Sequence, residues 1–533
     1  MFPLVTMFPF LHAGVHGLQP QWRSPMASTA SRPREGESRP VTRVMVGGMN
    51  ISIDDHRNTI SSIDVPMPDL AARGGIFDFA PSPSTFHGSH RLGDVSMRVR
   101  TAARGPYARL STSTRPDSVT SLSPPPAGEL AAADITGTLS TKLPLTLTRH
   151  YAAAAGGHGL EMRFVLTNMG NESLEVGAWG ASMILETMDT QGGGRRTLDD
   201  LAGNCSMVDP AIMGAHGWVS ATRMTGTGAV LLIIPEGGGG LQAWRHLPEA
   251  SGGLFYEAMS LSKAYADEEW KAARGEQWVV PTSDSVEPGE TLTFSYRLLL
   301  SPSVRDKEAT LAAAGYALLQ AVPGYTIGMD MMNATLHVRP PAAASIVSVT
   351  ADPASRMQLG APRPVGTRGM WAVGVRGIAH GRVRVSVTFS NGGVSIASYN
   401  VLPPFDEQLA RYGAFASQVA WYANVSDPFG RAPCVLAYNR ELKKRIGVGA
   451  WDGGYEDNRV FNNGLSDEAG AGANVGFAAK VSGAPNAAEV AKLDAYITQT
   501  LYGVKKGLPF GASLQCVDGD AAGEEPSCGP SSV

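Results

Sequence analysis

The sequence lacks the features that mark several common protein classes. Charged residues fill only 17% of its 533 positions, and the formal net charge is −4. No basic stripe with interleaved aromatic residues occurs, so nucleic acid is not an expected partner. No apolar run is long enough to cross a bilayer. The four cysteines, Cys205, Cys434, Cys516 and Cys528, form no Cys-x-x-Cys pair, so neither a zinc ribbon nor a dithiol redox motif is supported. We expect no metal and no other cofactor.

What the chain has in abundance is turn-forming residues and apolar residues. It contains 62 glycines and 36 prolines, and 43% of its residues are hydrophobic. This composition is typical of a globular, β-rich and loop-rich protein with large cores. The length predicts two to four domains.

The two ends of the chain differ in composition from the rest. Residues 1–40 combine several arginines with Ser, Pro and Thr and predict a disordered leader, and the apolar stretch 4–18 has no basic residue before it, which does not fit a signal peptide. Residues 516–533 predict a disordered tail, in which Cys516 and Cys528 either close a small loop or stay unpaired. N-glycosylation sequons weakly favour a secreted protein. They stand at Asn50, Asn171, Asn204, Asn333 and Asn424.

Residues 41–302 predict a large antiparallel β-sandwich, because many short strands follow one another with no helical period between them. Residues 45–53 and 59–65 form a predicted hairpin, and apolar and polar residues alternate over residues 160–166. The continuous apolar run 229–234 predicts a strand buried on both faces that ends at Pro235.

The second half of the chain predicts a smaller β-module and then helices. Residues 303–324 are expected to form a linker with a helix over residues 303–315. Residues 325–402 predict an Ig-like module of about five strands, with the hairpin turn Asn391-Gly392 as its clearest signal. From residue 403 to 515 the pattern becomes helical. The expected helices are 405–424, 466–482 and 486–502.

The strongest functional signal is a run of acidic and aromatic residues before the second of these helices. It contains five carboxylates (Asp452, Glu456, Asp457, Asp467 and Glu468) beside Trp451 and Tyr455. Glycoside cleavage needs one carboxyl group to protonate the leaving oxygen and another to activate water or attack carbon. Aromatic rings stack on the apolar faces of sugars. The sequence therefore predicts a saccharide site here, with an oligo- or polysaccharide as partner.

Each of these acids also has a structural interpretation. Ser466 followed by Asp467 and Glu468 is typical of a helix N-terminus, where a serine caps the helix and acids complement its dipole. The segment Asp452-Gly-Gly454 fits an ordinary turn.

Two further groups have weaker functional interpretations. His87 and His90 are better explained by turn chemistry than by metal binding, and Trp421 and Tyr422 by a helix core than by sugar binding.

Several phrases resemble an uncharacterised microbial family described only as a domain of unknown function, within an architecture of carbohydrate-active enzymes. The phrases lie at residues 168–176, 286–292, 303–311, 427–431, 464–472 and 488–492. That architecture has an N-terminal β-supersandwich, a small Ig-like module and an (α/α)6 toroid. The resemblance implies glycosidase-like chemistry by carboxylates rather than β-elimination, and it assigns no catalytic residue.

The helical region is short for that architecture. A toroid of twelve helices needs roughly 200 residues, whereas residues 403–533 supply 131. We therefore expect a partial toroid. Two hypotheses follow: a glycoside hydrolase-like enzyme with Asp467 and Glu468 as its preferred acid and base, or a non-catalytic glycan-binding or structural remnant of one.

Overall fold

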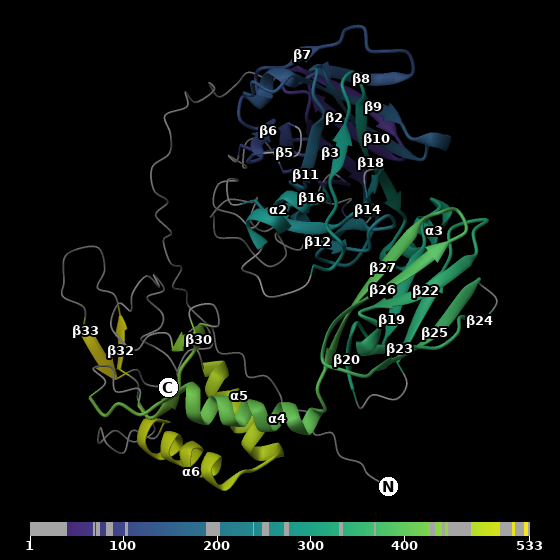
Figure 1. Cartoon of the computed structure of the whole chain (residues 1–533). Coiled ribbons are helices and arrows are strands. Elements are labelled where there is room, and N and C mark those ends of the chain that lie inside the picture. The colour runs from purple at the N-terminus through teal and green to yellow at the C-terminus, as the bar shows by residue number, and fades with distance from the viewer. Residues whose placement is uncertain are drawn as a thin grey trace.

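The protein is mostly β, with several antiparallel sheets and few helices, as the sequence predicts (Figure 1). It was analysed as a computed structural model. The residues that this structure describes are 40–67, 70, 75–81, 89–101, 105–187, 203–237, 239–247, 255–270, 277–329, 334–366, 369–426, 432–439, 443–445, 471–501, 514–517 and 527–530.

The chain opens with a four-stranded antiparallel sheet. Its strands are β1 (Val41–Val46), β2 (Met49–Asp54), β3 (Ile60–Pro66) and β4 (Ile76–Asp78). The predicted single strand over residues 45–53 is wrong, because Gly47 and Gly48 turn the chain between β1 and β2. Both glycines have positive φ, at 58° and 82°, which is the conformation that a two-residue hairpin turn requires.

Two larger sheets form the main sandwich. The eight-stranded sheet has the order β12 (Ser206–Ala211), β13 (Trp218–Arg223), β14 (Val230–Glu236), β18 (Thr291–Ser301), β10 (Gly159–Asn168), β9 (Leu145–Ala153), β8 (Glu129–Asp134) and β7 (Thr120–Ser121). The six-stranded sheet has the order β15 (Ala243–His246), β16 (Tyr256–Leu261), β11 (Leu174–Ser182), β5 (Val95–Thr101) and β6 (Ala108–Ser111), with β17 (Asp284–Val286) paired to β11. Strand β14 is buried on both faces, as its apolar run predicts, although it continues through Pro235 to Glu236.

Aromatic rings from the two sheets meet in the core of this sandwich. The rings of Trp179 and Phe294 stack with centroids 4.2 Å apart, and Phe164 meets Trp179 edge to face at 5.6 Å. The indole N–H of Trp179 donates to the hydroxyl of Tyr296 at 3.1 Å. Because this buried donor has a partner, the tryptophan adds its large apolar area to the core without the cost of an unmade hydrogen bond.

A short helix joins the large sandwich to a second, smaller one. Helix α3 (Lys307–Ala313) follows a 3-10 turn at Val304–Asp306, within the predicted helix 303–315. One sheet of the Ig-like module consists of β19 (Leu318–Val322), β21 (Ala334–Arg339), β25 (Met370–Gly377), β23 (Met357–Leu359) and β24 (Arg363–Val365). The other consists of β20 (Thr326–Gly328), β27 (Val394–Leu402), β26 (Gly381–Phe389) and β22 (Ile346–Asp352).

The two sandwiches touch at a buried polar contact. The Nδ1 atom of His216 lies 2.8 Å from the hydroxyl of Ser395, and Ile396 N donates to Met213 O at 3.0 Å. Burial lowers the pKa of His216, so the neutral imidazole is the form that suits this contact. The backbone hydrogen bond and the histidine together fix the module against the sandwich.

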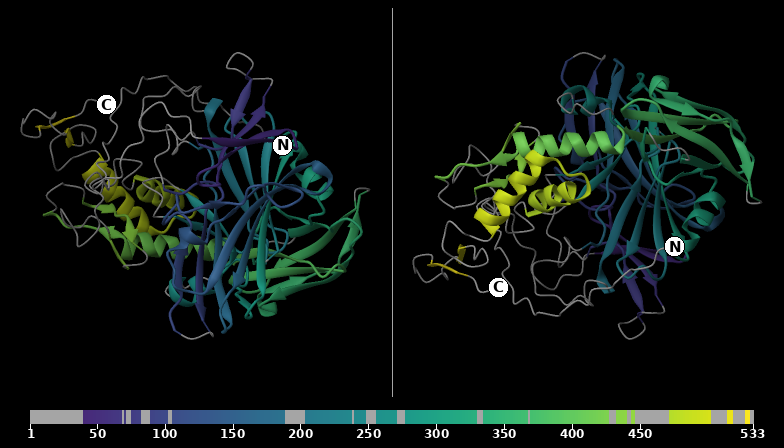
Figure 2. Two further views of the ribbon diagram at one scale, coloured as in Figure 1. Left: turned by 90° about the horizontal axis from the view of Figure 1, so that it is seen from above. Right: turned by 90° about the horizontal axis from the view of Figure 1, so that it is seen from below.

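The helical part of the chain departs most from the sequence prediction. Helix α4 (Phe405–Ala414) passes into a π-helical turn (Phe415–Val419), and the chain then enters β28 (Trp421–Tyr422), so the predicted single helix over residues 405–424 is wrong. The remaining elements are β29 (Cys434–Val435), β30 (Tyr438–Asn439), β31 (Lys444–Arg445), α5 (Ala471–Gly483), α6 (Ala487–Ala495), a π-helical segment (Tyr496–Leu501), β32 (Leu514–Val517) and β33 (Ser527–Pro530). Further views place α4–α6 and the Ig-like module on separate sides of the large sandwich (Figure 2).

None of the described helices has the length and apolar character needed to cross a membrane.

Candidate functional site

The saccharide site predicted from the sequence lies outside the residues that the structure describes. This holds for all seven of its residues: Trp451, Asp452, Tyr455, Glu456, Asp457, Asp467 and Glu468. The described chain stops at Arg445 before this segment and resumes at Ala471 with α5. The grouping of the seven side chains therefore stays a prediction, and what the structure provides is the support around them.

The helix that follows the predicted site is anchored at its beginning. The side chain of Asn474 accepts a hydrogen bond from Val435 N at 2.9 Å and donates to Val435 O at 3.3 Å. One buried amide thus ties the start of α5 to β29 in both directions. Phe477, one turn further along, is 1% exposed in the small helical core. The first half of α5 is therefore fixed against β29 and the helical core.

A buried ion pair joins α5 to α6. Lys480 donates to a carboxylate oxygen of Glu489, and the two side chains are 5% and 9% exposed. Helix α4 packs over this pair at Gly413, where any Cβ atom would collide with the Glu489 carboxylate. The pair and the glycine therefore set the mutual positions of α4, α5 and α6.

Trp421 and Tyr422 belong to the core of the helical part, as expected, although they lie on a strand and not on a helix. Tyr422 is 3% exposed beside Cys434 and Leu436. The indole of Trp421 packs against Phe477, and the Nζ atom of Lys492 lies 5.2 Å from its ring centroid. A sugar platform at these two residues has no support in this packing.

The loop containing His90 is held both by a turn hydrogen bond, as the sequence favours, and by contacts to distant strands. The two ring nitrogens of His90 lie 3.2 Å from the hydroxyl of Ser182 and 3.1 Å from that of Ser113. The carboxylate of Asp94 accepts from Arg91 N at 2.8 Å and from Thr112 Oγ1 at 2.7 Å. His87 lies outside the described residues. Within those residues, no group of three His, Cys, Asp or Glu side chains could hold a metal ion.

The outer face of the six-stranded sheet carries a charged network that the sequence did not reveal. Glu257 on β16 is fully buried, accepts a hydrogen bond from Ser96 on β5, and forms an ion pair with Arg245 on β15. Ser96 lies 161 positions before Glu257, so no local motif could have shown the whole network. A buried carboxylate with such partners acts as a structural link between strands.

The same network fastens a short helix over the sheet. Helix α2 (Lys263–Glu268) and the residue after it supply Glu268 and Glu269, which both pair with the guanidinium of Arg98. The ring of Tyr265 lies under that guanidinium, with 4.1 Å between the Arg98 Cζ atom and the ring centroid. Charge pairing and the cation–π contact together hold α2 in place.

Another carboxylate group with unusual electrostatics lies on the first sheet. Asp78 stands opposite Asp64 in the register of β3 and β4, and its Oδ1 atom accepts from Ile63 N at 2.7 Å and from Ala80 N at 2.9 Å. Burial raises the pKa of Asp78 to about 7, the two backbone donors oppose this rise, and the charges of Asp64 and Glu186 add to it. Burial also raises the pKa of Asp64.

This electrostatic arrangement predicts a pH-dependent stability. Because the pKa of Asp78 is higher in the folded than in the unfolded chain, the folded state holds an extra proton from about pH 4 to about pH 7. The stability contributed by that proton is fully present below pH 4 and is lost as the pH rises through 7. We expect Asp78→Asn, which keeps an oxygen acceptor, to raise the thermal midpoint clearly more at pH 8 than at pH 5.

Thermal unfolding of both proteins at the two pH values tests this expectation. The matched control is Asp209→Asn, since Asp209 is exposed on β12, and this variant should shift the midpoint little at either pH. Equal shifts for Asp78→Asn at pH 5 and pH 8 would show that Asp78 is not the titrating group.

Comparison with known proteins identifies a family and a structural likeness that extends over most of the chain. A family model described as "Family of unknown function (DUF5695)" matches residues 67–507. No curated protein matches the sequence. A solved polysaccharide lyase superimposes with a TM-score of 0.60 at 12% identity, over 85% of this chain and 60% of the lyase. That likeness shows a shared fold, and the chain spans 60% of the length of that protein.

Two further solved structures match with much lower scores. A GalM/aldose epimerase homologue from C. elegans has a TM-score of 0.29 at 10% identity, over 50% of this chain and all of the homologue. The GH36 α-galactosidase AgaA from Geobacillus stearothermophilus has a TM-score of 0.27 at 11% identity, over 54% of this chain and 45% of the enzyme. At these scores neither structure carries an inference about this chain.

Proposed function

Because the chain belongs to DUF5695, a family of unknown function, and shares its fold with a polysaccharide lyase, we propose that it acts on a polysaccharide. The observation that carries this proposal is the fold likeness, which extends over 85% of the chain at a TM-score of 0.60. The sequence adds independent support, because the carboxylates of residues 452–468 stand beside the aromatic residues that a sugar would need.

The proposed reaction is cleavage of a glycosidic bond by acid/base catalysis. Asp467 and Glu468 are the preferred pair, one as a general acid with a raised pKa and the other as base or nucleophile. Their support is positional, since both precede α5, the helix that Asn474 and Phe477 anchor. Asp452, Glu456 and Asp457 are the alternatives.

The sugar itself would bind to the aromatic residues of the same segment. Trp451 and Tyr455 would stack on the apolar faces of the rings, and the acids would lie on either side of the scissile oxygen. Stacking leaves the hydroxyl groups of the sugar free to accept and donate hydrogen bonds. The sequons and this substrate class both favour a protein that works outside the cell.

Two alternatives to hydrolysis each follow from a specific observation. The structural relative is named a lyase, and a lyase breaks the same bond by elimination, which leaves an unsaturated uronate. The short helical region motivates the second alternative, a non-catalytic glycan-binding protein that retains affinity without cleavage.

A panel of polysaccharides offered to the purified chain separates these activities. We would record binding, newly formed reducing ends, and the ultraviolet absorbance of an unsaturated product. Reducing ends without unsaturation indicate hydrolysis, and both together indicate elimination. Binding alone indicates the non-catalytic alternative. A well-folded sample that neither binds nor cleaves any member of a broad panel would contradict the proposal.

A further inference from the structure

The Ig-like module differs in charge from the rest of the molecule. Residues 317–402 contain seven arginines and no lysine, against two aspartates and no glutamate, which gives a net charge of +5. The whole chain, in contrast, carries −4. Such a concentration of guanidinium groups in one small module attracts anions to it even though the protein as a whole is acidic.

Three of the arginines are already engaged within the molecule. Arg384 pairs with Asp352 at 3.4 Å, and the Cζ atom of Arg382 lies 5.3 Å from the ring centroid of Trp278. Arg356 donates to Arg382 O at 3.0 Å. These contacts stabilise the second sheet of the module and its contact with the segment around Trp278.

The other sheet of the module presents two arginines on its outer face. Side chains alternate along β25, and Val373 and Val375 are buried in the core, so Gly374 and Arg376 face outward. Arg363 on β24 stands opposite Ala372 of β25 in the strand register and therefore shares this outer face. Among the described residues, no carboxylate forms an ion pair with Arg363 or Arg376.

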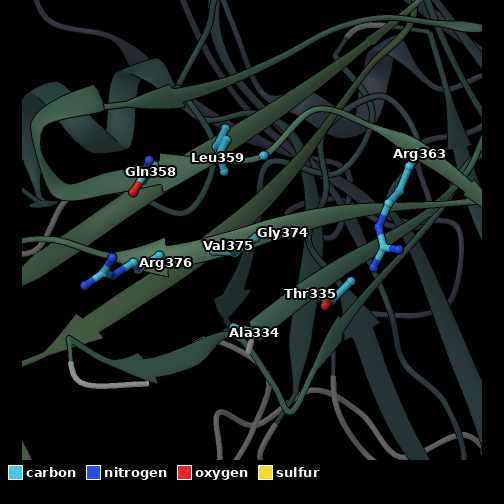
Figure 3. Close-up of a pocket in the computed structure, with 9 residues that line it drawn as sticks. Ala334, Thr335, Gln358, Leu359, Arg363, Gly374, Val375 and Arg376 are labelled. Atoms are coloured by element: carbon cyan, nitrogen blue, oxygen red, sulfur yellow. The ribbon is translucent and has the colours of Figure 1, made fainter. Parts of the chain in front are cut away.

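An open hollow of about 430 Å³ lies between these two arginines (Figure 3). Thr335 and Gln358 add a hydroxyl and an amide to its lining, and Gly360 and Gly374 expose the backbone. A Cβ atom at Gly374 would meet nothing within 4 Å, so the hollow owes its depth at this point to a glycine. Its volume lies in the range of ligand sites in proteins.

We propose that this hollow binds a carboxylate-bearing polysaccharide, such as a polyuronate. Guanidinium groups recognise carboxylates through paired hydrogen bonds. Arg376 and the residue opposite Arg363 are four positions apart on β25, which is about 13 Å along a strand. That separation exceeds one sugar ring, so the two arginines would engage carboxylates on different units of one chain. The hydroxyl, the amide and the exposed backbone would bind the sugar hydroxyls between them.

Nucleic acid fits this surface less well than a polyuronate. None of the residues lining the hollow is aromatic, whereas proteins that bind single strands stack the bases on aromatic rings. The assignment rests on the proposed function in that it names the class of polysaccharide on which the protein would act. It concerns binding at the Ig-like module, however, and needs no cleavage.

Binding measurements on the full chain test the proposal. The probes are polygalacturonate, neutral dextran and single-stranded polyadenylate. We expect the wild-type protein to prefer polygalacturonate and Arg363→Gln/Arg376→Gln to bind it at least tenfold more weakly, since one charged hydrogen bond contributes a factor of that order. Gly374→Glu, which places a carboxylate in open space within the hollow, should also weaken binding.

The control removes the same charge elsewhere. Arg115→Gln/Arg305→Gln changes two exposed arginines outside the module and should leave the affinity within twofold. Equal weakening by both double variants would show a general charge effect and overturn the proposal, as would equal wild-type affinity for dextran or polyadenylate. The binding measurement does not depend on cleavage. A wild-type chain that prefers polygalacturonate but cleaves no polysaccharide would therefore contradict the proposed reaction and support this proposal.

Discussion

Replacing Glu468 with glutamine is expected to lower turnover of a cleaved polysaccharide by about 10² to 10⁴-fold, the contribution typical of one acid/base group. Glutamine keeps the size and polarity of the side chain but can neither donate nor accept the catalytic proton. The fold should stay intact, because the two side chains are almost identical in shape. The measurement is the initial rate of reducing-end formation.

The control for this experiment is Glu172→Gln. Glu172 is exposed in the turn between β10 and β11, so its replacement should leave the rate unchanged. If Glu468→Gln retains activity within threefold of wild type, the assignment of Glu468 is wrong. Asp467→Asn, Glu456→Gln, Asp457→Asn and Asp452→Asn would then be measured in the same way.

Breaking the buried ion pair of the helical part should cost about 3–5 kcal/mol of local stability, because the remaining charge is left buried without its partner. Lys480→Met leaves the Glu489 carboxylate, 9% exposed, between α5, α6 and Gly413. The double variant Lys480→Met/Glu489→Leu removes both charges and should recover most of the loss. Hydrogen exchange in peptides from α5 and α6 is the suitable measurement, since it reports the local stability of these helices separately from that of the sandwiches.

A surface ion pair on α4 provides the comparison. Arg411 pairs with Glu407 one turn earlier, and these side chains are 67% and 44% exposed. Arg411→Met should change the protection of α4 by less than about 1 kcal/mol. If Lys480→Met proves equally mild, the buried pair does not hold the helices together. If Lys480→Met loses much stability and Lys480→Met/Glu489→Leu does not recover it, the shape of these side chains and not their charge stabilises the helices.

Several strands of both sandwiches were predictable because they carry their own pattern. Alternation in residues 160–166 and 382–389, and the turn at Asn391-Gly392, describe β10, β26 and β27 closely. The local pattern did not predict the structure where the same residues fit two different arrangements of strands. The apolar residues of 45–53 fit one strand as well as two, and the positive φ of Gly47 and Gly48 decided between them.

The charged networks of the described residues were less predictable, because they depend on contacts between distant segments. The pKa of Asp78 depends on Asp64 and Glu186, which are 14 and 108 positions away. The network around Glu257 joins three strands and a helix in the same way. The sequence did identify a dense group of carboxylates and aromatic residues, but density along the chain does not by itself fix how close the side chains lie.

The position of β18 in the eight-stranded sheet has a consequence for how the chain is made. This strand, residues 291–301, lies between β14 and β10, and its partners were synthesised more than fifty and more than a hundred residues earlier. Until β18 leaves the ribosome, both neighbouring strands present unpaired edges. The apolar residues that later pack against Phe294 stay exposed to solvent during that time. The sandwich can therefore be completed only after its last strand in the sequence, β18, has been synthesised. The growing chain passes through a long interval in which a chaperone would have to shield those edges from other chains.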